Sequence, residues 1–68
     1  MMTSTMAAKI AQETDRAVIE DARLWLLKRF PGTEDTVANL SDAEVVYWTD
    51  GYYGGWDEFV TARRIRSN

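Results

Sequence analysis

Apolar side chains recur at helical spacing through residues 7–30, a stretch that contains neither glycine nor proline. Positions three, four and seven apart share one face of a helix, so this spacing predicts a single long helix. It should end before Pro31-Gly32, because a proline disfavours helical geometry in the residue before it. Arg16, Glu20 and Arg23 mark its water-facing side. The main apolar stripe, expected to cover the rest of the chain, is Ala7, Ala11, Val18, Ala22, Trp25 and Leu26.

The same stretch carries a second apolar row. Ile10, Ala17 and Leu24 are each seven residues apart, and Leu27 follows three beyond. A helix in a small monomer needs only one buried stripe, so we interpret the second row as the seam of a homodimer. The alternative is one wide core that leaves Leu24 and Leu27 partly exposed.

Two short helices are predicted after the long one, over 42–53 and 56–66. Ser41 and Glu44 match the capping box, in which each side chain accepts a hydrogen bond from the other residue's backbone amide. Gly54-Gly55 ends the first of these helices, because glycine tolerates the left-handed conformation there. Residues 32–39 show no apolar period and are expected to form a connector. Residues 1–6 are expected to be disordered. The sequence predicts an all-α, hairpin-like single domain over 1–68.

The chain has 68 residues and contains neither cysteine nor histidine. Small domains bury a modest share of their surface and commonly gain stability from disulfides, metals or association. This composition removes disulfides, thiol chemistry and the usual zinc ligands, which leaves association. The N-terminus lacks a signal-peptide pattern and no apolar run approaches a membrane span, so we expect a cytoplasmic protein without membrane insertion.

Charge is unevenly distributed along the chain. Residues 31–62 hold seven acids and no base, and Arg63, Arg64 and Arg66 follow directly. Such asymmetry bears on partners and association, although a solvated acidic face with arginines at a helix C-terminus is the simpler interpretation. Without histidine no Ser-His triad exists, and so short a chain has little room for a cleft with two carboxylates. We therefore expect no enzymatic activity, no cofactor and no metal.

Five of the eight aromatic residues lie within residues 47–56. A helix of this length can bury only one side, and we assign Val45, Trp48 and Tyr52 to its buried face, with Trp56 also in the core. Tyrosine, tryptophan and arginine are enriched among the residues that dominate binding energy. The side chains left for contact with a partner are Tyr47, which points away from the buried face, Tyr53 at its margin, and the charged Asp50, Arg63 and Arg64.

Two segments carry a resemblance to known proteins: 40–46, Leu-Ser-Asp-Ala-Glu-Val-Val, and 53–60, Tyr-Gly-Gly-Trp-Asp-Glu-Phe-Val. Together they resemble small, early-expressed proteins of temperate phages of Pseudomonas-like hosts. The combination also looks like phage anti-quorum-sensing proteins, small helical dimers that bind a LuxR-type regulator and a pilus-assembly ATPase. The partner-binding residues of that family cannot be aligned with positions of this sequence, so none is assigned here. The resemblance implies a protein that binds and inhibits a host protein by blocking its surface, without chemistry.

The alternative function is a small nucleic-acid-binding transcription regulator that contacts phosphates through its C-terminal arginines. The sequence pI near 4.7 argues against it, because nucleic-acid-binding domains usually show a basic footprint. A structural or assembly protein of a virion is a third possibility, and no sequence feature distinguishes it.

Overall fold

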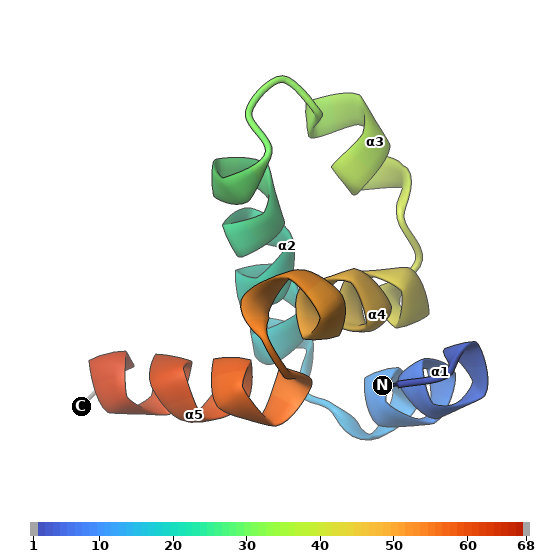
Figure 1. Ribbon diagram of the computed structural model, residues 1–68, viewed down its shortest axis with the longest axis vertical. Coiled ribbons are helices and arrows are strands. Elements are labelled where there is room, and N and C mark those ends of the chain that lie inside the picture. The colour runs from blue at the N-terminus through green and yellow to red at the C-terminus, as the bar shows by residue number, and fades with distance from the viewer. Residues whose placement is uncertain (1, 68) are drawn as a thin grey trace.

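The computed structural model describes the backbone of residues 2–67 and the side chains of residues 2–65. Over this range all regular structure is helical, which confirms the all-α prediction. Figure 1 shows α4 lying across α2, with α1 and α5 near one end of α2 and α3 near the other. The five helices are α1 (Ser4–Glu13), α2 (Arg16–Arg29), α3 (Glu34–Asn39), α4 (Asp42–Tyr53) and α5 (Trp56–Ser67).

The prediction of one long helix over 7–30 is wrong, because the chain turns at Thr14 and Asp15. Thr14 has extended backbone geometry, and its hydroxyl donates a hydrogen bond to the carbonyl of Ile10 at 2.6 Å. Asp15 then caps α2, and its carbonyl accepts from the amide of Val18 at 3.0 Å. Threonine suits such a position because its short polar side chain bonds to a nearby backbone group, whereas the side chain of Asp15 makes no capping hydrogen bond. Neither glycine nor proline is needed for this break.

This break also divides the predicted dimer seam. Ile10 lies on α1, whereas Ala17, Leu24 and Leu27 lie on α2. Ile10 and Leu27 are half-buried against the core, while Ala17 and Leu24 remain exposed. The four side chains therefore form no continuous row along one helix, and the argument for a seam at this place is lost.

Two further segments differ from the predictions. Residues 1–6 were expected to be disordered, but α1 begins at Ser4, and the Thr3 hydroxyl caps it by accepting from the Met6 amide at 3.1 Å. Met1 lies outside the described residues. The expected connector over 32–39 contains α3, whose Val37 is buried. A single apolar residue anchors this short helix, so no apolar period reveals it.

The core forms where α1, α2 and α5 meet α4. The main stripe is confirmed, since three of its members are fully buried and the other three pack against the core. Ile19, on the same side of α2, is also buried and was missed. Trp56 is buried as predicted, stacked on Phe59 with ring centroids 5.5 Å apart. The buried hydrophobic residues are Ala7, Ile19, Ala22, Leu26, Val37, Val45, Val46, Trp56 and Phe59.

The buried face of α4 is rotated relative to the prediction. Val45 is buried as expected, but Trp48 and Tyr52 are 37% and 54% exposed, so their assignment to the core is wrong. Val46 and Thr49 occupy the buried positions instead. The helix follows an i, i+4 pattern from Val45 through Thr49, whereas the prediction followed i, i+3. This rotation turns two large aromatic side chains to the surface.

The ends of α4 form as predicted. The Ser41 hydroxyl accepts from the Glu44 amide at 3.1 Å, and the Glu44 carboxylate accepts from the Ser41 amide at 2.9 Å. These bonds lower the pKa of Glu44, chiefly through the backbone amide of Ser41. Gly54 ends the helix with φ of 101°, a left-handed conformation that suits glycine. The tight turn at Gly54-Gly55 brings the start of α5 back to the end of α4.

Candidate functional site

Large aromatic side chains gather on the outer surface of α4. Tyr47, Trp48 and Tyr52 are all exposed, and the centroids of the Trp48 and Tyr52 rings lie 5.8 Å apart. Phe30, just beyond α2, meets Tyr52 edge to face at 4.8 Å, and the guanidinium of Arg29 lies 5.1 Å from the centre of the Phe30 ring. Ring contacts of this kind hold the side chains in place. We call Phe30, Tyr47, Trp48 and Tyr52 the aromatic ridge.

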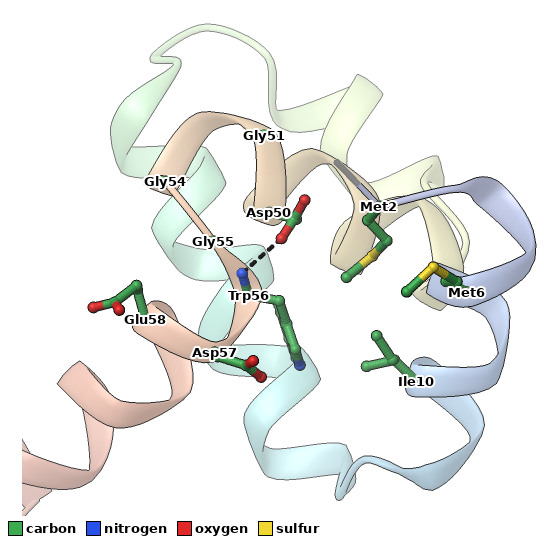
Figure 2. Close-up of a pocket in the computed structure, with 10 residues that line it drawn as sticks. All are labelled: Met2, Met6, Ile10, Asp50, Gly51, Gly54, Gly55, Trp56, Asp57 and Glu58. Carbon is green, nitrogen blue, oxygen red and sulfur yellow. Dashed lines mark hydrogen bonds between the residues drawn. The ribbon is translucent and has the colours of Figure 1, made fainter.

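A groove runs beside the aromatic ridge, between the N-terminal segment and α4. Its larger part, about 650 Å³, lies where Met2, Met6 and Ile10 point toward the indole of Trp56 (Figure 2). A second part of about 380 Å³ shares Met2 and continues along Tyr47, Trp48 and Tyr52. We call these two hollows together the α1–α4 groove. Its apolar walls come from segments that are distant in the sequence.

The charges around the groove have one sign. Asp50, Asp57 and Glu58 line its larger part, and Glu44 lines a smaller adjoining hollow beside Tyr47. No lysine or arginine lines any of these hollows within the described residues. Nor do the described residues include a group of three or more potential metal ligands. The groove therefore combines an apolar floor with an acidic edge.

Asp50, predicted as a contact residue, has a structural role. Its carboxylate accepts a hydrogen bond from the backbone amide of Trp56 at 2.8 Å, and its own carbonyl accepts from the amide of Gly55 at 2.9 Å (Figure 2). The Trp56 amide is one of the first in α5 and has no partner within that helix. Asp50 thus joins the end of α4 to the start of α5 at the edge of the groove.

Tyr53 is turned toward the core rather than toward the groove. It is half-buried, and its ring meets Trp25 at 5.2 Å and Phe59 at 5.4 Å, both edge to face. Of the three contact residues predicted in α4, only Tyr47 lies on the aromatic ridge. Sequence reasoning missed Trp48 and Tyr52 because it assigned both to the buried face of α4, and no pattern within α4 shows that they are exposed.

The C-terminal arginines are apart from the aromatic ridge. The Nε of Arg63 donates to the carboxylate of Asp21 at 2.5 Å, which ties α5 to α2. Arg64 is exposed and lines a separate hollow with Glu13 and Asp15. The side chain of Arg66 lies outside the described residues. The predicted partner-binding set is therefore not one surface.

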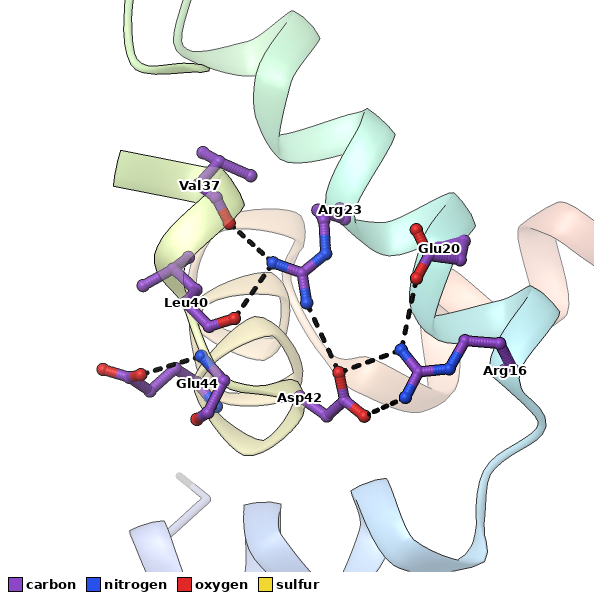
Figure 3. Close-up of polar contacts among 8 residues, drawn as sticks. Arg16, Glu20, Arg23, Val37, Leu40, Asp42 and Glu44 are labelled. Atoms are coloured by element: carbon purple, nitrogen blue, oxygen red, sulfur yellow. Dashed lines mark hydrogen bonds and ion pairs between the residues drawn. The ribbon is translucent and has the colours of Figure 1, made fainter. Parts of the chain in front are cut away.

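An ion-pair network fixes the other end of α4 (Figure 3). The Asp42 carboxylate accepts from Arg16 at 2.6 Å and from Arg23 at 3.3 Å. Arg23 also donates to the carbonyls of Val37 and Leu40, at 2.6 and 3.0 Å. The hydrogen bond to Asp42 is the main reason why the pKa of Arg16 is raised. Arg23 was expected on the water-facing side of the long helix, but it instead holds the end of α3 and the start of α4 against α2.

Comparisons with known proteins add no relative. No protein-family model, no curated protein and no solved structure matches this chain. Within the described residues, no helix combines the length and the apolar character that crossing a membrane would require.

Proposed function

We propose that this protein binds another protein through the aromatic ridge and the α1–α4 groove. It inhibits this target by covering a functional surface and catalyses no reaction. The exposure of Tyr47, Trp48 and Tyr52 on one face of α4 carries this proposal. Contiguous exposed apolar surface is uncommon in small proteins that function alone and often marks an interaction site. Rigid aromatic side chains also lose little conformational entropy when a partner covers them.

The groove adds adaptability and charge to this surface. Met2 and Met6 line it, and methionine adjusts its shape to irregular apolar partners. The carboxylates of Asp50, Asp57 and Glu58 favour a partner with basic side chains, because complementary charge accelerates association and fixes orientation. The DNA-binding face of a transcription regulator has this character. A LuxR-type regulator of a phage host, which the resemblance implies, is therefore the first candidate, and a pilus-assembly ATPase is the second.

A nucleic-acid-binding role has less support. This role depends on the C-terminal arginines, and of these Arg63 is within ion-pair distance of the carboxylate of Asp21. The net charge of −3 also opposes approach to a polyanion.

Titration calorimetry with a purified LuxR-type regulator tests the proposal. We expect Trp48→Ala and Tyr52→Ala to weaken binding by about 2 kcal/mol or more, as for dominant interface residues. Thr36→Ala, at an exposed position on α3, is the matched control and should bind like the unmodified protein. Equal affinity of all three variants would place the contact surface elsewhere.

If neither candidate partner binds, a photo-crosslinking residue at position 48 extends the test to host lysate, with the same residue at position 36 as the control. A host protein captured from position 48 and not from position 36 would be purified and titrated in the same way. Capture that does not differ between the two positions would contradict the proposal.

A further inference from the structure

Gly51 lies inside α4 at a position where the fold itself does not require glycine. Its backbone is helical, whereas the glycines with positive φ are Gly32, Gly54 and Gly55. A Cβ atom added to Gly51 would meet no other atom within 4 Å, so no close packing demands glycine either. Glycine is unfavourable inside a helix, because it loses more conformational freedom on folding than alanine does. What glycine provides at this position is an opening in the surface of the helix.

This opening forms the floor of the second part of the α1–α4 groove, the hollow of about 380 Å³. Helical side chains lean toward the preceding turn, so a side chain at position 51 would cover the space beside Tyr47 and Trp48. Met2 closes the hollow from the N-terminal segment (Figure 2). We call this hollow the ridge pocket, and its lining residues are Met2, Tyr47, Trp48, Asp50, Gly51 and Tyr52.

The ridge pocket combines aromatic rings with a carboxylate. The centroids of the Trp48 and Tyr52 rings are 5.8 Å apart and their planes are inclined by 48°. A single cation can therefore lie within about 6 Å of both centroids, the range over which a ring attracts a cation. One oxygen of Asp50 accepts from the Trp56 amide, which leaves the second oxygen for a cation. No lysine or arginine lines the ridge pocket within the described residues.

The aromatic ridge already holds one cation that belongs to the protein itself. The guanidinium of Arg29 lies 5.1 Å from the centre of the Phe30 ring, and this ring meets Tyr52 edge to face at 4.8 Å. Arg29 does not line the ridge pocket. The rings of Trp48 and Tyr52 are 37% and 54% exposed, so they remain open to a cation from outside.

We propose that the ridge pocket binds a quaternary ammonium group, of the kind carried by choline or by the side chain of trimethyl-lysine. Aromatic pockets bind such groups through the attraction between the cation and the ring faces. A primary ammonium has three N–H donors and is strongly hydrated, whereas the pocket offers it one carboxylate among apolar walls. A quaternary ammonium has no N–H to leave unsatisfied. This binding requires no protein target, so it goes beyond the proposed function.

Titration with choline tests the proposal, and the neutral alcohol in which carbon replaces the nitrogen of choline is the matched control. The proton NMR signal of the Trp48 indole N–H, identified by its absence in Trp48→Ala, reports binding. We expect choline to shift this signal at millimolar concentration and the neutral alcohol to bind about tenfold more weakly, because it has the shape without the charge. Equal binding of the two ligands would overturn the proposal.

Two variants test the place of binding. Gly51→Leu fills the floor of the ridge pocket and should abolish the shift caused by choline, while the melting midpoint is kept or raised, because leucine favours a helix more than glycine does. Thr36→Leu, at an exposed position on α3, is the control and should bind choline like the unmodified protein. Tyr52→Ala removes one ring without filling the pocket and should also weaken binding. Unchanged choline binding in Gly51→Leu and in Tyr52→Ala would overturn the assignment.

Two peptides distinguish the source of the ammonium group. One contains trimethyl-lysine, and the other has the same sequence with unmodified lysine. Binding of choline without the methylated peptide assigns the pocket to a free small molecule, whereas binding of the methylated peptide assigns it to a protein side chain. Equal binding of the two peptides, or binding of neither choline nor the methylated peptide, would overturn the proposal. These titrations contain no target protein, so their outcome is separate from that of the proposed function.

Discussion

The carboxylate of Asp50 accepts a hydrogen bond from the backbone amide of Trp56, 2.8 Å away across the α4–α5 turn. Asp50→Ala should lower the free energy of unfolding by about 1 kcal/mol, as loss of a helix-capping side chain does. In so small a domain the melting midpoint should fall by roughly 4–8 °C. Asp50→Asn keeps an acceptor oxygen and is the control. Equal melting of both variants would mean that the carboxylate charge, not the hydrogen bond, stabilises the turn.

Trp56 and Trp48 should differ in their effect on folding. Trp56 is buried, so Trp56→Ala should cost about 3–5 kcal/mol and unfold much of the population. Trp48 is 37% exposed on the aromatic ridge, and Trp48→Ala should cost far less. Urea unfolding followed by circular dichroism measures both. If Trp48→Ala were the more damaging change, the rotation of α4 described above would be contradicted.

Arg23 and Arg16 contact the same carboxylate but should differ in importance. Arg23 also satisfies two backbone carbonyls, and its side chain is only 18% exposed. Arg23→Ala should therefore destabilise the protein by about 1–3 kcal/mol, because two partly buried carbonyl acceptors lose their donor. Arg16 is 64% exposed, so solvent screens its ion pair and Arg16→Ala should destabilise the protein much less than Arg23→Ala. Chemical denaturation of both variants gives the comparison, and similar losses would contradict it.

Low pH should reduce the contribution of the N-terminal cap of α4 to the stability of the fold. The pKa of Glu44 is lowered from its ordinary value of 4.5 by hydrogen bonds from Ser41. A carboxyl with a lowered pKa in the folded state stabilises the fold fully above its unfolded pKa, and this contribution is lost as pH falls through the folded value. The stability difference between the unmodified protein and Glu44→Ala should thus shrink as pH falls below 4.5. A difference that stays constant over this range would contradict the linkage.

Local signals predicted the second half of the fold better than the first. The capping box at Ser41 and the glycines after Tyr53 act through neighbouring backbone groups, so their positions define α4 without knowledge of the rest of the chain. At the break, the hydroxyl of Thr14 bonds to the carbonyl of Ile10, four residues earlier, and a threonine inside a continuous helix can make the same bond. A stretch without glycine or proline therefore gave no warning of it.

The candidate site was harder to predict because it depends on tertiary structure. Both i, i+3 and i, i+4 spacing from Val45 lead to plausible buried residues, Trp48 and Tyr52 in one case and Thr49 and Tyr53 in the other. Hydrophobicity favours the first set, yet the structure buries the smaller and more polar Thr49. The groove itself requires α1 to fold back along α4, which no pattern within α4 indicates.

Helix α1 is attached to the rest of the molecule by little more than apolar contact. Its only fully buried side chain is Ala7, and among the side chains of residues 2–65 no hydrogen bond or ion pair joins α1 to another helix. Because α1 is a terminal helix with one fully buried side chain, its backbone amides should exchange with deuterated water before those of α2 and α4. Because Ala7 of this helix belongs to the core and Ile10 packs against it, any displacement of α1 would widen the groove and expose part of the core in the same movement.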